Sequence, residues 1–145
     1  MARVAFQTAV RAAAVTLLTD YKEAASINLQ IYRARPATIR PPTAFVDEIA
    51  ETITYTALHQ RVPTASVVVL HGLFDHGDTV DQRDAFVDGF LDWCLDRYHA
   101  AGANTLLAVT EVRDEPAYVP EWLSPENQRT YYATRIELEG FAASG

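Results

Sequence analysis

The chain has 145 residues, a formal net charge of −7 and 49% hydrophobic residues, which is typical of one folded domain. Charged residues make up 21% of it, too few for intrinsic disorder, and no apolar run approaches the roughly 18 residues of a membrane span. The single cysteine, Cys94, excludes an internal disulfide and a cysteine-based zinc site. Composition therefore predicts one soluble domain, residues 1–145, from a reducing compartment.

Charge is divided unevenly along the chain. Residues 1–72 carry seven Arg and Lys against five acids, a net charge of +2, whereas residues 73–145 carry five Arg against fourteen acids, a net charge of −9. The acidic total argues against a simple DNA-binding module, which needs clustered cations. The division would let the acidic surface of one copy meet the basic surface of the next, although solvated charge without a partner explains it equally well.

The first half of the chain predicts one helix and two strands. Apolar residues recur at spacings of three and four over residues 4–25, which indicates an amphipathic helix. Alternation predicts a short strand over residues 29–33 and a longer one over residues 45–55, whose odd-numbered apolar residues share one face. Between them, residues 34–43 (ARPATIRPPT) hold three prolines and two arginines, so we expect a mobile, basic loop.

The second half begins with three consecutive valines in residues 63–74, which predict a buried central strand. A helix is predicted over residues 78–100, beginning at Asp78 and burying a stripe that includes Phe86, Phe90, Leu91, Cys94 and Leu95.

Strands are predicted over residues 104–113 and 131–141, and a proline-rich interaction loop over residues 114–128. The order α-β-β-β-α-β-β predicts an α+β fold, a mostly antiparallel sheet with both helices packed on one face.

Five aspartates lie at spacings of three and four along the edge of the second helix that is opposite its apolar stripe. Like charges at this spacing each destabilise an isolated helix by about 0.2–0.5 kcal/mol, so a purely structural sequence would normally interleave lysines. The aspartates are consistent with a solvated face, with a face that meets arginines of a partner, or with a channel wall that repels DNA. This aspartate ladder comprises Asp81, Asp84, Asp88, Asp92 and Asp96.

Two further groups are candidate contacts to a partner or to another copy. Arg33, Arg35 and Arg40 lie in or beside the basic loop, where their guanidinium groups suit carboxylates of an adjacent subunit. Tyr118 and Trp122 lie in the proline-rich loop and are candidate anchors, with Trp122 expected to be free in the isolated subunit.

Four residues of the metal-ligand type, His71, Asp75, His76 and Asp78, occur within eight positions. They fall across a strand end and a turn, where no helix fixes two imidazoles together, and a surface turn explains the same residues. A small metal-dependent enzyme that uses His71, Asp75 and His76 is therefore an alternative. We expect no cofactor, and Cys94 is expected to be a core residue whose thiol pKa is raised by burial.

Five segments carry a resemblance to the tail-terminator proteins of long-tailed, siphovirus-type bacteriophages, particularly those of actinobacterial hosts: FVDEIAETITYT, QRVPTASVVVLHGLFD, DQRDAFVDGFLDW, HAAGANTL and PENQRTYYATRIELEGF. The resemblance runs from about Pro41 to Phe141 and rests on overall pattern, element order and length.

The resemblance implies a non-enzymatic protein that is assembled in the host cytoplasm and lies at the head–tail junction of the virion. Six copies would form a ring on the finished tail tube protein, stop tube polymerisation and meet the head–tail connector protein. Viral DNA would pass through the ring without specific binding, and no membrane is involved. A head-completion or neck protein, similar in size and ring-forming habit, is the alternative within virion assembly.

Overall fold

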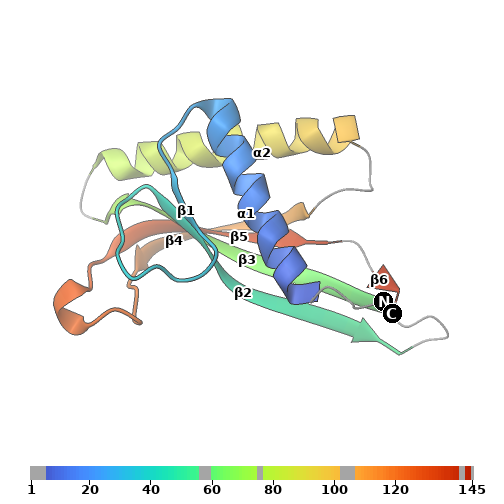
Figure 1. Ribbon diagram of the computed structural model, residues 1–145. Helices are drawn as coiled ribbons and strands as arrows, with labels where there is room; N and C mark the ends of the chain where they lie inside the picture. The colour runs from blue at the N-terminus through green and yellow to red at the C-terminus, as the bar shows by residue number, and fades with distance from the viewer. Residues whose placement is uncertain (1–5, 56–59, 75–76, 102–106, 141–142, 145) are drawn as a thin grey trace.

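The computed structural model describes residues 6–55, 60–74, 77–101, 107–140 and 143–144 (Figure 1). The predicted α+β class and the order α-β-β-β-α-β-β are confirmed, although the first strand is only three residues long. No helix in these ranges is both long and apolar enough to cross a membrane. The elements are α1 (Phe6–Ala25), β1 (Gln30–Tyr32), β2 (Thr43–Thr54), β3 (Gln60–Leu73), α2 (Asp78–Ala101), β4 (Ala108–Tyr118), the short 3-10 helix η1 (Pro125–Asn127), β5 (Tyr131–Glu139) and β6 (Ala143–Ser144).

The strands form a mixed sheet in the order β1-β2-β3-β5-β4, and β6 pairs with one end of β3. Strand β1 is parallel to β2, and every other pair is antiparallel. Strand β3 lies in the centre, with Val67 and Val69 buried on one face and Val68 and Leu70 on the other. This confirms the predicted central strand, because a strand covered on both faces reads as a continuous apolar run.

Both helices cover one face of the sheet, as predicted (Figure 1). Leu17 of α1 and Phe90 of α2 belong to the same buried cluster as Val67 of β3 and Ile136 of β5. The stripe predicted for α1 is confirmed, since Val10, Leu17 and Tyr21 are all buried. We call the opposite side of the sheet the open face, because neither helix covers it.

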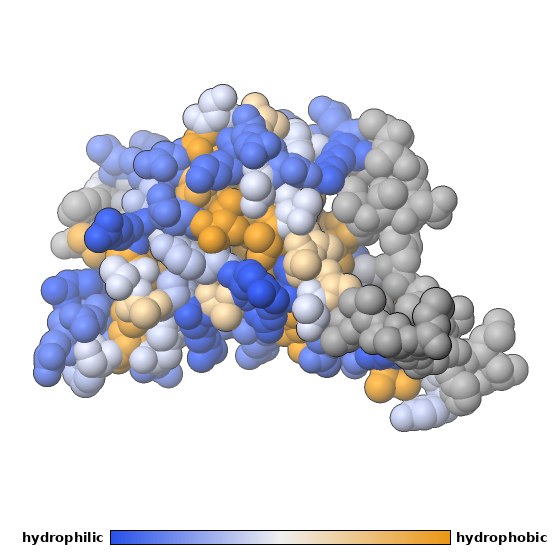
Figure 2. All heavy atoms as spheres, viewed as in Figure 1, coloured by the Kyte–Doolittle hydropathy of each residue, from blue (hydrophilic) through white to orange (hydrophobic). Residues whose placement is uncertain are grey.

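The helices meet where Tyr21 lies against α2. Its ring contacts Phe86, Phe90 and Trp93, with ring centroids 5.2–5.6 Å apart. Its hydroxyl oxygen lies 2.6 Å from the position that a Cβ atom on Gly89 would occupy, so glycine permits this close approach. Figure 2 shows hydrophobic residues gathered near the centre of this side of the molecule, with hydrophilic residues around them.

The predicted buried stripe of α2 is wrong at Leu95, and Leu91 is half-buried without belonging to either apolar cluster of the described residues. Phe90 is buried and Phe86 and Cys94 pack against the same core, but Leu95 is 58% exposed and Trp93 packs there instead. The reason is helical geometry, since Leu95 lies about 140° around the helix from Phe90 and Trp93 only about 60°. Cys94 is half-buried and packs against the core, as predicted, and burial raises the pKa of its thiol to about 12.

A β-bulge in β2 overturns the single apolar face predicted for residues 45–55. The register with β3 shifts between Val46 and Glu48, which makes Asp47 an inserted residue. As a result Phe45 packs on the open face, whereas Ile49 packs under the helices. The alternation rule fails here because one inserted residue moves every following side chain of the strand to the opposite face of the sheet.

Strand β4 ends later than predicted, and among the described residues it begins at Ala108. It runs to Tyr118, so the predicted loop over residues 114–128 is wrong for its first five residues, while residues 104–106 lie outside the described residues. Pro116 is tolerated because β4 is an edge strand and the register with β5 shifts between Glu115 and Tyr118. Gly102, which directly follows α2 in the sequence, also lies outside the described residues.

A second apolar cluster occupies one end of the open face. Ile39 from residues 34–43 and Trp122 from residues 114–128 cover it, together with Tyr118 at the end of β4. The two segments that the sequence indicated as loops therefore close over this end of the sheet. The buried members of the cluster are Phe45, Val68, Leu70, Tyr131 and Ala133.

Candidate partner-binding site

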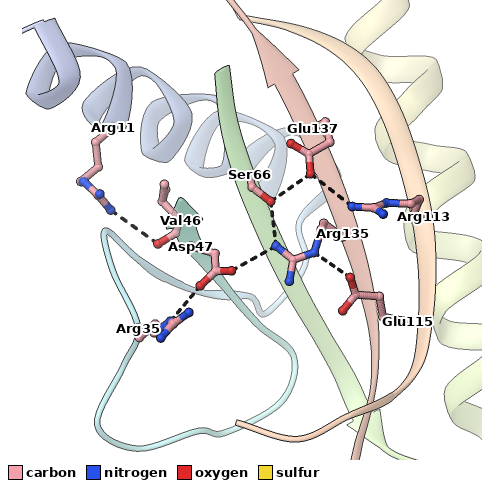
Figure 3. Close-up of polar contacts among 9 residues, drawn as sticks. All are labelled: Arg11, Arg35, Val46, Asp47, Ser66, Arg113, Glu115, Arg135 and Glu137. Carbon is pink, nitrogen blue, oxygen red and sulfur yellow. Dashed lines mark hydrogen bonds and ion pairs between the residues drawn. The ribbon is translucent and has the colours of Figure 1, made fainter. Parts of the chain in front are cut away.

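A network of charged side chains lies on the open face (Figure 3). It adjoins the second apolar cluster where Arg35 contacts Trp122. At its centre, the Arg135 guanidinium donates to a carboxylate oxygen of Asp47 at 3.0 Å, to one of Glu115 at 2.6 Å and to Ser66 Oγ at 2.8 Å. Strand alternation places Arg135 here, because its neighbour Ile136 points under the helices. Burial lowers the pKa of Arg135, but the hydrogen bonds to both carboxylates raise it by more.

Asp47 is the most buried acid of this network, with a side chain that is only 4% exposed. Oδ2 accepts from Arg135, and Oδ1 accepts from Arg35 Nε at 2.8 Å. The bulge turns this carboxylate toward the open face, and the two guanidinium groups offset the cost of removing it from water. Asp47 thus links β2 to β5 across the central strand, and it also holds residues 34–43 against the sheet.

The network continues toward β4 through more exposed groups. Ser66 Oγ donates to Glu137 at 3.1 Å, and Arg113 lies 3.7 Å from the same carboxylate (Figure 3). Arg113 is 56% exposed, so water and salt screen this outer pair. The strong electrostatics of the open face are therefore concentrated at Asp47 and Arg135.

Arg35 and Trp122, predicted as separate partner contacts, contact each other. The Arg35 guanidinium lies 5.1 Å from the centroid of the Trp122 ring, and the indole Nε1 donates to the carbonyl of Pro36 at 2.9 Å. The same ring meets Phe45 edge to face, with centroids 5.3 Å apart. The expectation that Trp122 is free in the isolated subunit is not met, because its ring covers the second apolar cluster.

A groove of about 660 Å³ lies beside these contacts. Arg35 and Trp122 line one part of it, and Tyr118 at the end of β4 lines another. Burial raises the pKa of Tyr118 to about 12, so its phenol is protonated at neutral pH. Three of the predicted interface residues thus converge on one groove.

The remaining predicted interface residues do not line this groove. Arg33 and Arg40 are exposed and lie toward the two ends of the basic segment. The aspartate ladder is exposed along α2, and of its members only Asp84 has an ion-pair partner in the described part of the chain, Arg83 at 3.1 Å. The ladder and the two free arginines therefore form separate surface groups.

His71 is buried between β3 and α2 rather than placed as an accessible ligand. Its ring packs against Phe86, with centroids 5.3 Å apart, and its Nε2 lies 2.8 Å from Thr134 Oγ1. Because Thr134 Oγ1 also accepts from Arg83 Nε at 3.0 Å, the threonine hydroxyl can give its own proton to a neutral His71.

The metal-site alternative is only partly covered by the structure. Asp75 and His76 lie outside the described residues. Within the described ranges, no group of three or more His, Cys, Asp or Glu side chains could hold a metal ion.

Folding stability is expected to fall as the pH drops from about 6.5 to about 4. Burial, reinforced by Arg83, lowers the pKa of His71 from 6.5 to about 4. In this pH range the unfolded chain binds a proton at His71 and the folded chain does not. The free energy of unfolding should therefore fall by roughly 3 kcal/mol by about pH 4. Urea unfolding at several pH values measures this, and His71→Gln should flatten the profile. An unchanged slope in His71→Gln would contradict a buried neutral imidazole.

Sequence reasoning missed the two residues that anchor the site, Asp47 and Arg135. Asp47 was visible only as an acid that interrupts the apolar face of a strand, and Arg135 as one of several charges on the solvent side of β5. Because a buried carboxylate needs a cationic partner, Asp47 on an apolar strand was the one signal in the sequence for a buried ion pair. Its partner lies 88 positions away and could not be chosen without the sheet order.

A comparison with solved structures gives a distant likeness. No family model matches the chain, and no curated protein matches it. Among solved structures, a chain of the virion of a native gene transfer agent particle is similar, with a TM-score of 0.43 and 11% sequence identity. The likeness covers 94% of this chain and 100% of that chain. At this level of similarity it carries no argument about function.

Proposed function

We propose that this protein is a structural component of a phage-like virion and acts as its tail terminator. A ring of six copies caps the finished tail tube, stops its polymerisation and presents a surface to the head–tail connector, while viral DNA passes through the ring. One observation carries the proposal: four of the five segments that resemble tail-terminator proteins lie mainly on β2, β3, α2 and β5, while most of the fifth, HAAGANTL, lies outside the described residues. The resemblance therefore follows the folded core.

The distribution of surface charge supports a ring of identical subunits. Such a ring needs two different, complementary surfaces on every copy. The aspartate ladder supplies an acidic surface, and Arg33 and Arg40 supply a basic one. Arg35 is withdrawn from this basic surface in part, because Asp47 and the Trp122 ring hold it within its own subunit.

Charge exchange across this contact is expected to disrupt and then restore assembly. Asp88→Arg should weaken the ring, and adding Arg40→Asp should recover part of the loss, because the pair keeps opposite charges in exchanged positions. Exposed ion pairs contribute only about 0–1 kcal/mol each. Because salt screens exposed charges, the effect should shrink in high salt. Native mass spectrometry and sedimentation measure it, with a hexamer expected for the unchanged protein. Glu126→Arg, an exposed acid in η1, is the matched control.

Two outcomes would contradict the pairing. If Asp88→Arg leaves the ring intact but slows DNA passage, the ladder lines the channel instead. If the ring forms equally well with either single change and loses nothing in high salt, the two surfaces do not meet. Stoichiometric metal in the purified protein would instead support the small-enzyme alternative.

A further inference from the structure

We propose that the groove between Arg35, Trp122 and the end of β4 binds an arginine-bearing segment of a partner protein. The inference is independent of the terminator role, because it rests on the chemistry of the groove and not on ring formation. It assigns a class of ligand to this groove, which has a volume of about 660 Å³ and lies on the open face.

The charge of the groove favours a cation. Five acids and two arginines line it, which gives a net charge of −3: Asp47, Glu48, Asp114, Glu115 and Glu121 against Arg35 and Arg135. Three of the acids already have partners, since Asp47 and Glu115 bind Arg135 and Asp114 accepts from Tyr132.

Two of the lining acids form no salt bridge among the described residues. Glu48 and Glu121 are both exposed, and the charge of Glu48 acts only at longer range on Arg35, whose pKa it helps to raise. An incoming cation would find no salt bridge to break at these two carboxylates. The same negative charge disfavours the phosphates of a nucleic acid.

The aromatic lining favours arginine over lysine. Trp122 already accepts one guanidinium, that of Arg35, 5.1 Å from its ring centroid, which shows that the ring and the adjacent carboxylate suit this group. Tyr118 lies next to it, with ring centroids 6.4 Å apart. A planar guanidinium stacks on such rings and binds a carboxylate through two N–H groups, whereas an ammonium group cannot do both.

The occupant is a segment of another protein rather than of a second copy. The exposed arginines of this chain that neighbour the groove in sequence, Arg33, Arg40 and Arg113, lie on segments that already form its walls through Arg35 and Asp114. Val119, 38% exposed, adds an apolar contact for the backbone of an incoming peptide.

The test uses the full chain and a capped Gly-Arg-Gly-Arg-Gly peptide, followed by the NMR signal of the Trp122 indole N–H. We expect the peptide to shift this signal, and the double variant Glu48→Gln/Glu121→Gln to bind it roughly fivefold more weakly. The matched control, Glu23→Gln/Glu139→Gln, removes two exposed carboxylates from α1 and β5 that do not line the groove, and it should change binding less than twofold. The corresponding lysine peptide should bind more weakly than the arginine peptide.

Three results would overturn the proposal. An unshifted Trp122 signal would show that the peptide does not enter the groove. Equal weakening by the groove variant and the control variant would show a general electrostatic attraction. Loss of self-association in the groove variant, with peptide binding unchanged, would assign the groove to a second copy of this chain.

Discussion

Phe90→Ala is expected to lower the free energy of unfolding by roughly 3–5 kcal/mol, the usual cost of removing a large side chain from a packed core. Phe90 is 1% exposed and lies between α2 and the sheet. Its ring stacks on Phe86, with centroids 5.7 Å apart, and meets Tyr21 edge to face at 5.2 Å. The cavity would therefore open where both helices join the sheet. Urea unfolding followed by circular dichroism measures the loss.

Leu95→Ala on the same helix is the control. Because Leu95 is 58% exposed, its truncation should change the stability by less than about 0.5 kcal/mol. Similar losses for the two variants would show that α2 is rotated relative to the orientation described here. A negligible loss for Phe90→Ala would show that this face of α2 is not buried at all.

Arg135→Met is expected to cost roughly 3–5 kcal/mol, although methionine keeps much of the packing of the side chain. Among the described residues, the variant leaves Asp47, whose side chain is 4% exposed, with Arg35 as its one cationic partner, and Arg35 is 49% exposed. It also removes the partner of Glu115 at 2.6 Å. Thermal and urea unfolding should both report the loss, because the network joins β2, β5 and β4.

Arg113→Met on the adjacent strand is the matched control. Arg113 lies on the same open face but is 56% exposed, so its loss should cost under about 1 kcal/mol. Combining Arg135→Met with Asp47→Asn should cost less than the sum of the single changes, because the second change removes the buried charge that the first leaves unpaired. Strict additivity, or equal costs for Arg113→Met and Arg135→Met, would contradict a buried network centred on Asp47.

The periodicity of apolar residues predicted correctly the elements that bury the same face or faces along their whole length. The stripe of Val10, Leu17 and Tyr21 is covered on one side only and shows the 3.6-residue period, and β3 is covered on both sides and shows none. The predictions failed where one residue changed the local rule. The inserted Asp47 moves the following side chains of β2 to the opposite faces of the sheet. Pro116 made the second half of β4 look like a loop, because proline occurs in a strand only at an edge or a bulge.

The candidate site could be predicted only in part, because it depends on contacts between segments far apart in the sequence. Arg35, Tyr118 and Trp122 were recognisable as candidates by residue type. Their convergence required the second apolar cluster, which draws residues 34–43 and 114–128 onto the same end of the sheet. The Asp47–Arg135 pair likewise depends on β2 and β5 flanking the same central strand. The partner roles of Arg33, Arg40 and the aspartate ladder stay predictions.

Electron microscopy of particles from a phage that lacks this gene tests the terminator role most directly. If the protein caps the tail tube, tube subunits continue to add after the normal end point, and the particles should show tails of uncontrolled length. Supplying the gene in trans should restore a single tail length. Tails of normal length that lie unattached beside filled heads would contradict the account and would indicate a head-completion or neck protein.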